Sequence, residues 1–297
     1  VPYRRCLGYS FVGFYVSSIT PSATGGQPAQ IYCMGQDEIP AAHGALNMML
    51  IAACYQLATL IWGGGVWLLC PKAGVFSGGM GVLLLYGAGM MVLLTVGMGV
   101  VMFLPGVSRR ICGGVLRLME NLHLLRNPAS AREKLQRQLE EYAKGADCVK
   151  ANPGLALKVL FLCVVQLGML FSVPWMVYLA FGLQGHEWIQ IAGLQALLTL
   201  AVSNLPLPGA VGPAEGGFVS AFAAVFGTGM VTPAMLVSRG ISFYAFLIIS
   251  FTVSLAVHLR IRRQARERAL REMAASRQGG RVVAMRRYLR GTMGQEV

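Results

Sequence analysis

Two ionisable residues lie in otherwise apolar stretches toward the C-terminal end of the chain. Glu215 follows a Pro/Gly-rich break, and Arg239 lies in the first turns of a long apolar stretch. A charged side chain within a membrane is energetically expensive, and such residues usually line a functional path. We therefore expect Glu215 and Arg239 to contact a ligand or to pair with each other. The alternative is a purely structural ion pair.

The break before Glu215 has a counterpart near the N-terminus. Both copies follow the pattern S-x-x-P-x6-P-A-[Q/E], once from Ser18 to Gln30 and once from Ser203 to Glu215. A break in a helix frees backbone N–H and C=O groups, which lipid cannot satisfy. The helix that follows each break presents a positive end that suits an anion. The match predicts two broken helical hairpins that meet near the membrane midplane, and the alternative is a chance match of two Pro-rich loops.

The composition is typical of a helical membrane protein. Of the 297 residues, 55% are hydrophobic and 12% are charged, whereas soluble domains carry about 25% charged residues. Extended apolar segments in lipid must be helical, and the alternation of a β-barrel is absent. We expect Pro174 to kink one span. The expected full spans are residues 43–70, 80–104, 154–182 and 233–258.

Glycines in the first two spans predict places where helices approach closely. They are Gly63, Gly64, Gly65, Gly87, Gly89, Gly97 and Gly99.

Basic residues predict the orientation of the chain. Residues 105–153, an amphipathic helix running into a solvated one, and the tail 259–297, with 11 Arg, hold most of the positive charge. Under the positive-inside rule both segments are cytoplasmic. The number of crossings between them must then be even. We therefore expect residues 188–227 to enter and leave on the outer side, as a re-entrant hairpin broken at 206–213.

The predicted fold is all-α: a polytopic transmembrane helical bundle with two inverted-topology repeats, each with a Pro/Gly-broken re-entrant hairpin. The chain starts at Val1 without a signal-peptide pattern, so we expect further sequence ahead of it. The expected parts are a membrane domain at 1–258, divided into a first repeat at 1–104, a basic linker at 105–153 and a second repeat at 154–258, and an Arg-rich tail at 259–297.

We expect no cofactor, no metal site and no catalytic residues. The seven Cys form no C-x-x-C pair, and no zinc or haem signature appears. Neither a Ser/His/Asp grouping nor a G-x-S-x-G motif is present. The basic segments are typical of topology signals that touch anionic lipid, so we expect no specific nucleic-acid partner.

The second break resembles a family signature. Residues 205–216, LPLPGAVGPAEG, resemble the P-x-P-G-G-x-G-x-x-E-G signature of the lysylphosphatidylglycerol synthase/flippase transmembrane family, and Arg239 falls where that family carries an Arg in the next helix. Residues 20–28, TPSATGGQP, resemble its earlier T-P-x-x-x-G-G-E-P element. The chain departs from the family pattern at Gln27, usually Glu; at Gln30, often Arg; and at Ala210, usually Gly.

The resemblance implies a function in lipid transport. The family includes the multiple peptide resistance factor, in which a soluble domain attaches lysine to phosphatidylglycerol and the membrane domain moves the product to the outer leaflet. This lowers the negative surface charge and gives resistance to cationic antimicrobial peptides. Only 39 residues follow residue 258, so we expect a flippase in the bacterial cell membrane rather than an enzyme. The alternatives are a phosphatidylglycerol lysyltransferase, a transporter of another amphiphile and a membrane partner of a separate synthase.

The implied partners are anionic and aminoacylated phospholipids of the membrane, and formation of a homo-oligomer is left open. We expect Glu215 and Arg239 to contact the headgroup charges and backbone N–H groups of the glycines to contact the phosphate. The expected headgroup-binding residues are Gly25, Gly26, Gln27, Gln30, Gly209, Gly212, Pro213, Glu215 and Arg239.

Overall fold

The described part of the chain forms helices and no strand. The computed structural model describes residues 1–69, 79–121, 128–205, 207–264, 266–267 and 270. Five segments within these residues are long and apolar enough to cross a membrane, so the chain is a multi-pass membrane protein and the predicted all-α transmembrane fold is confirmed. Four match the expected spans: Ala41–Val66, Gly81–Phe103, Pro153–Ala180 and Val231–Gln264. The fifth, Pro208–Phe226, joins a short 3-10 turn to the helix that follows it.

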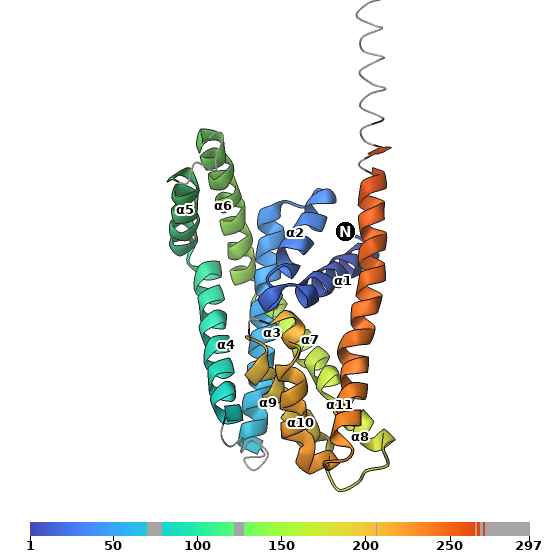
Figure 1. The fold of residues 1–297 in the computed structure, drawn as a ribbon. Helices are drawn as coiled ribbons and strands as arrows, with labels where there is room; N and C mark the ends of the chain where they lie inside the picture. The colour runs from blue at the N-terminus through green and yellow to red at the C-terminus, as the bar shows by residue number, and fades with distance from the viewer. Residues whose placement is uncertain (70–78, 122–127, 206, 265, 268–269, 271–297) are drawn as a thin grey trace, which may run out of the picture.

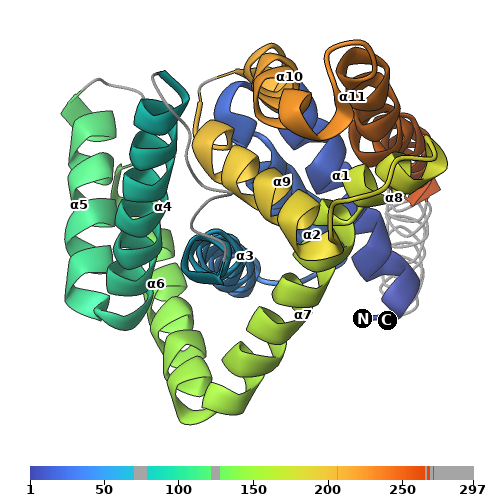
Figure 2. The ribbon, with the colours of Figure 1, turned by 90° about the horizontal axis from the view of Figure 1, so that it is seen from below.

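Helix α3 (Ala41–Leu69) lies at the centre of the bundle. It contacts α4 (Gly79–Phe103), α7 (Pro153–Phe171) and α9 (Trp188–Val202), and Figure 2 shows these helices around it. Trp62 of α3 donates its indole N–H to the carbonyl oxygen of Val164 at 3.0 Å. A buried indole N–H needs such a partner, so this bond helps to hold α7 against α3.

The basic linker forms two helices, and the C-terminal part of the second packs against α3 with the buried residues Ala146 and Val149. Helices α5 (Pro105–Asn121) and α6 (Pro128–Ala151) contact each other and extend beyond the end of α4. The span Val231–Gln264 is the last helix of the described residues, and Figure 1 shows α5 and α6 at the same end of the molecule as its C-terminal end. The basic linker and the described part of the Arg-rich tail therefore share one end of the molecule.

The expected kink near Pro174 is present. Helix α7 ends at Phe171, and α8 (Val173–Ala180) begins one residue before the proline. Ser172 lies between the two helices, where its hydroxyl donates to the carbonyl oxygen of Gly168 at 2.7 Å. The Ser172 hydroxyl thus supplies a hydrogen-bond donor to a helix carbonyl group at the point where the helix is interrupted.

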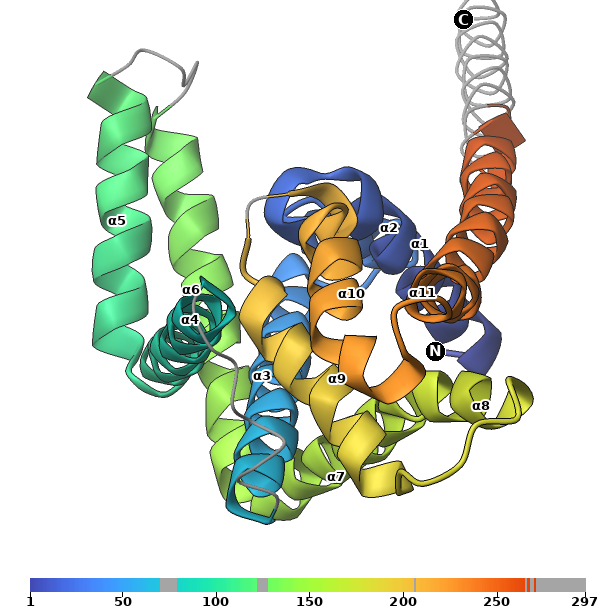
Figure 3. The ribbon, with the colours of Figure 1, turned by 60° about the horizontal axis from the view of Figure 1, so that its bottom comes forward.

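Two helical hairpins meet turn to turn beside α3. The first comprises α1 (Tyr3–Ile19) and α2 (Gly26–Gln36), and the second comprises α9 and α10 (Pro213–Phe226). These helices have 11 to 17 residues, so at about 1.5 Å per residue none reaches the roughly 30 Å of a hydrocarbon core. Their 3-10 turns, η1 (Pro21–Ala23) and η3 (Pro208–Ala210), contact each other (Figures 1 and 3).

The two turns share a backbone conformation. Ala23 and Ala210 end them with φ of 54° and 53°, a left-handed conformation that is uncommon for residues other than glycine. This likeness aligns Pro21 with Pro208, two residues away from the Pro206 that the letter pattern paired with Pro21. The register differs because residues 203–207 join α9 to its turn, whereas Thr20 alone joins α1 to its turn.

The glycine contacts predicted for the first two spans are confirmed at two positions. A Cβ added at Gly87 would lie 1.9 Å from the carbonyl oxygen of Leu200, and one at Gly63 would lie 2.7 Å from the Leu200 side chain. Helices α3 and α4 therefore both approach α9 at Leu200. The prediction is wrong for the rest, since an added Cβ would have no such neighbour within 4 Å at Gly64, Gly65, Gly89, Gly97 and Gly99.

We expect Gly87→Ala to lower the thermal unfolding temperature of the purified protein in detergent. The new methyl group overlaps the Leu200 backbone, and overpacking of this kind costs about 1–3 kcal/mol, which exceeds the ~1 kcal/mol that alanine gains over glycine in a helix. Gly89→Ala on the same helix is the matched control, because it meets open space. Equal unfolding temperatures for the two variants would contradict the close approach of α4 and α9.

Candidate functional site

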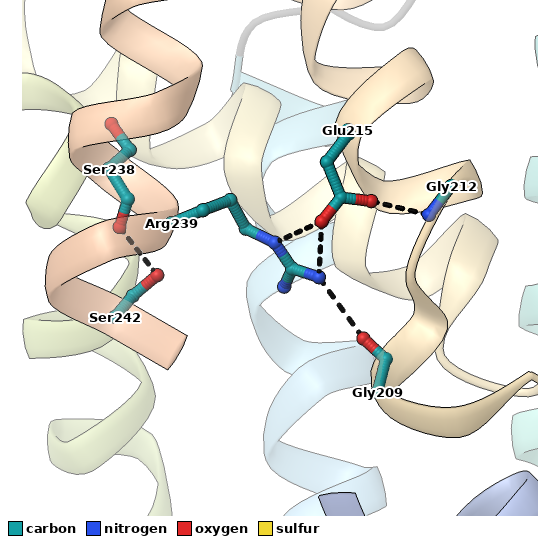
Figure 4. A network of polar contacts seen from close by, with 6 residues as sticks. All are labelled: Gly209, Gly212, Glu215, Ser238, Arg239 and Ser242. Carbon is teal, nitrogen blue, oxygen red and sulfur yellow. Dashed lines mark hydrogen bonds and ion pairs between the residues drawn. The ribbon is translucent and has the colours of Figure 1, made fainter. Parts of the chain in front are cut away.

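Glu215 of α10 and Arg239 of α11 (Val231–Arg239) form an ion pair. Nε and Nη2 of Arg239 each lie 2.9 Å from Oε1 of Glu215. Nη2 also donates to the carbonyl oxygen of Gly209 at 3.1 Å (Figure 4). The side chains are 20% and 17% exposed. The pair is therefore shielded from most solvent but remains reachable by a ligand.

The start of α10 holds the Glu215 carboxylate in place. Glu215 is the third residue of the helix, and its Oε2 accepts a hydrogen bond from the Gly212 N–H at 2.5 Å. Gly212 has φ of 94°, which glycine adopts without steric cost. Pro213 occupies the first helical position, where no N–H is needed. The positive end of the helix thus stabilises the chain's own carboxylate.

Arg239 lies where the last helix changes its winding. The five-residue π-helical segment η4 (Gly240–Tyr244) begins directly after it, and such segments inside α-helices are rare and often lie at functional sites. The ring of Phe243 in this segment has its centroid 4.7 Å from the guanidinium carbon of Arg239. This is a cation–π contact, which favours a charged guanidinium at this position.

Phe243 also links the ion pair to helix α1 of the first hairpin and to the η3 turn of the second. Its ring centroid lies 6.3 Å from that of Phe14 in α1. On the other side, a Cβ added at Gly209 would lie 2.6 Å from Cζ of Phe243, and Gly209 has φ of 59°. The η3 turn can approach the ring this closely only with glycine at position 209.

The expected residues of the first hairpin lie apart from this network. Within the described residues, no hydrogen bond or ion pair joins Gly25, Gly26, Gln27 or Gln30 to Glu215 or Arg239. A Cβ added at Gly26 would lie 1.9 Å from the Ser17 hydroxyl oxygen, and the Gln30 side chain covers Gly13 of α1. These residues pack α2 against α1, while the Gln27 side chain is exposed.

Two glycine N–H groups expected to contact phosphate have acceptors within the protein. The Gly25 N–H donates to the Thr20 hydroxyl at 3.1 Å, and the Gly212 N–H donates to Glu215. A phosphate at either position would have to compete with these bonds.

Sequence reasoning missed the aromatic half of the site. Phe14 and Phe243 lie in apolar stretches, where a phenylalanine gives no signal that separates it from ordinary core residues. The π-helical segment was also missed. The sequence contains one relevant cue, Gly240 directly after Arg239.

Comparison with known proteins identifies one matching family. The family described as "Lysylphosphatidylglycerol synthase TM region" matches residues 1–250 of the chain. No curated protein and no solved structure matches the chain.

We expect the ion pair to be energetically coupled. Glu215→Ala and Arg239→Ala should each lower the free energy of unfolding by about 2–4 kcal/mol, because each leaves a shielded charge without its partner. The double variant should lose at least about 1 kcal/mol less than the sum of the two. The cycle is measured by denaturant unfolding of the detergent-solubilised protein.

Ser242→Ala is the control for this cycle. The Ser242 hydroxyl donates to the Ser238 carbonyl oxygen within its own helix (Figure 4), so its loss should change the free energy of unfolding by less than about 1 kcal/mol. Strictly additive effects of the Glu215 and Arg239 substitutions would show that the two side chains do not interact.

Proposed function

The chain belongs to the family of the lysylphosphatidylglycerol synthase transmembrane region, and on that basis we propose that it moves lysylphosphatidylglycerol, or a related aminoacylated phospholipid, between the leaflets of the cell membrane. One observation carries the proposal. An ion pair, Glu215 with Arg239, lies beside the contact between the turns of two hairpins that are built from short helices.

In this proposal the two hairpins are re-entrant and enter the membrane from opposite faces. Their short helices and their contacting turns support this arrangement. Backbone groups released at the breaks need partners inside the membrane. The protein offers such partners at the second break: Arg239 donates to the Gly209 carbonyl oxygen at 3.1 Å, and Glu215 accepts from the Gly212 N–H.

The ion pair suits a headgroup that carries both signs of charge. The guanidinium of Arg239 matches the geometry of a phosphate, and the carboxylate of Glu215 accepts hydrogen bonds from an ammonium group. A lysyl-bearing phosphodiester can replace both halves of the ion pair at once, so that neither charge is left unpaired. A lipid with a phosphate alone would leave Glu215 without a cation, which is unfavourable in a shielded site.

The proposed orientation places α5, α6 and the last helix's basic end in the cytoplasm. Helices α5 and α6 lie at the same end of the molecule as the described part of the Arg-rich tail (Figure 1), and positive charge marks the cytoplasmic side. Movement of an aminoacylated lipid from there to the outer leaflet reduces negative surface charge. The physiological result in this proposal is weaker binding of cationic antimicrobial peptides.

The proposal predicts that Glu215→Ala slows lipid translocation. The protein is reconstituted into vesicles with fluorescent lysylphosphatidylglycerol, and the fraction accessible to an added quencher is followed with time. Loss of a charge-assisted hydrogen bond to the lysyl ammonium should reduce the rate at least about tenfold.

Glu267→Gln is the matched control. Glu267 is an exposed acidic residue near the C-terminal end of the described part of the last helix. The Glu267→Gln variant should therefore translocate lipid at the same rate as the unchanged protein. A Glu215→Ala rate equal to that of Glu267→Gln would reject Glu215 as a headgroup contact. The absence of translocation above that of protein-free vesicles would reject the function itself.

A further inference from the structure

A groove separate from the ion-pair site lies between the first hairpin and the last helix. It has a volume of about 300 Å³, is formed mainly by apolar side chains of α1, α2 and the last helix, and shares no lining residue with the ion-pair site. Its size is at the lower end of the ~300–1,000 Å³ typical of small-molecule sites. Lining residues include Val16, Ala29, Tyr32, Leu255, Val257 and Ile261.

One end of the groove leads to a cluster of charged residues. Val257, Ile261 and Cys33 line both the groove and an adjoining recess, where Arg4, Arg5, Asp37 and Arg260 gather. Figure 1 shows the N-terminal end of α1 beside the long last helix at this place. The apolar groove and the charged cluster are therefore one continuous surface.

Two guanidinium groups of this cluster share one carboxylate. Nη1 of Arg5 lies 2.9 Å and Nη2 of Arg260 lies 3.6 Å from Oδ1 of Asp37. The Tyr9 hydroxyl donates to Oδ2 of Asp37 at 2.5 Å. Each guanidinium has five N–H donors, so Arg5 and Arg260 keep donors for a further acceptor.

The accessible groups of this cluster are the cationic ones. The side chains of Arg5 and Arg260 are 37% and 41% exposed, whereas that of Asp37 is 12% exposed. An approaching ligand therefore meets guanidinium groups rather than the carboxylate. With Arg4 also exposed, the local charge is complementary to an anion.

We propose that this groove and its arginines bind an anionic phospholipid, with an acyl chain along the groove and the phosphate at Arg5 and Arg260. The inference rests on the groove and the charges and does not depend on the proposed translocation. Arginine next to an apolar surface that enters the membrane is placed to meet a phosphate at headgroup level.

The position along the last helix favours a membrane lipid over a soluble anion. Arg260 lies near the C-terminal end of the span Val231–Gln264, where the chain leaves the hydrocarbon. The groove extends from there toward Phe251, whose ring packs against Tyr15 with centroids 5.5 Å apart. Tyr32, Phe251 and Leu255 expose 48–61% of their surface beside the groove, which suits an acyl chain rather than water.

The test is native mass spectrometry of the full chain in detergent, titrated with phosphatidylglycerol and with phosphatidylcholine of the same acyl chains. Arg260→Gln should weaken phosphatidylglycerol binding at this site about tenfold or more, because a charge-assisted contact is lost, and should leave phosphatidylcholine binding unchanged. Arg263→Gln is the matched control, since Arg263 is exposed on the same helix and does not line the groove. The Arg263→Gln variant should bind phosphatidylglycerol with an affinity within about twofold of that of the unchanged protein.

A second variant tests the groove without altering any charge. Ala29→Trp fills the apolar groove and should reduce phosphatidylglycerol binding, while the thermal unfolding temperature reports whether each variant is folded. The site is overturned if folded Arg260→Gln and Ala29→Trp both bind phosphatidylglycerol as the unchanged protein does, or if phosphatidylcholine binds equally well and responds equally to Arg260→Gln. If inorganic phosphate competes fully for Arg260-dependent binding and Ala29→Trp has no effect, the site takes a soluble anion and the lipid proposal fails.

Discussion

In the proposed re-entrant arrangement, backbone groups at the two helix breaks must find partners within the protein, because lipid offers none. The two breaks meet this constraint differently. At the first break the Thr20 hydroxyl accepts from the Gly25 N–H and donates to the Val16 carbonyl oxygen. At the second break a charged pair satisfies the backbone groups. Glu215 accepts from the Gly212 N–H, and Arg239 donates to the Gly209 carbonyl oxygen. The turns are alike in backbone but one is neutral and the other is ionic.

This difference bears on how a ligand can bind. Charges are expensive to shield, and each member of the Glu215–Arg239 pair keeps the other stable. A ligand that displaces one member must supply a replacement charge for the other. In the function proposed above, the site discriminates by the number and sign of charges on a headgroup, more than by its shape. The neutral first turn has no comparable means of selection, since Gln27 and Gln30 take the places where the family pattern more often has charged residues.

The sequence predicts the elements well where physical constraints are local. Apolar length alone locates α3, α4 and the last span, and Pro174 marks the interruption between α7 and α8. Glu215 and Arg239 stand out because charge is rare in such segments. The sequence left open whether they contact a ligand or pair with each other, and the structure shows the pair. The register of the two turns was less accurate, because matching letters cannot detect that residues 203–207 lengthen one connection. The prediction of glycine contacts was wrong at most positions, because the sequence does not show where the neighbouring helix lies. Gly87 and Gly89 look alike in sequence, and only the position of α9 distinguishes them.

The π-helical segment Gly240–Tyr244 affects the direction in which the later residues of the last helix face. Arg239, just before the segment, is paired with Glu215, and Arg260, beyond it, lies 3.6 Å from Asp37. A π-helical turn contains more residues than an α-helical turn, because each of its hydrogen bonds spans five residues instead of four. The segment therefore rotates every later position about the helix axis relative to a regular α-helix. The face that Arg260 presents to Asp37 depends on this offset as well as on its distance along the chain.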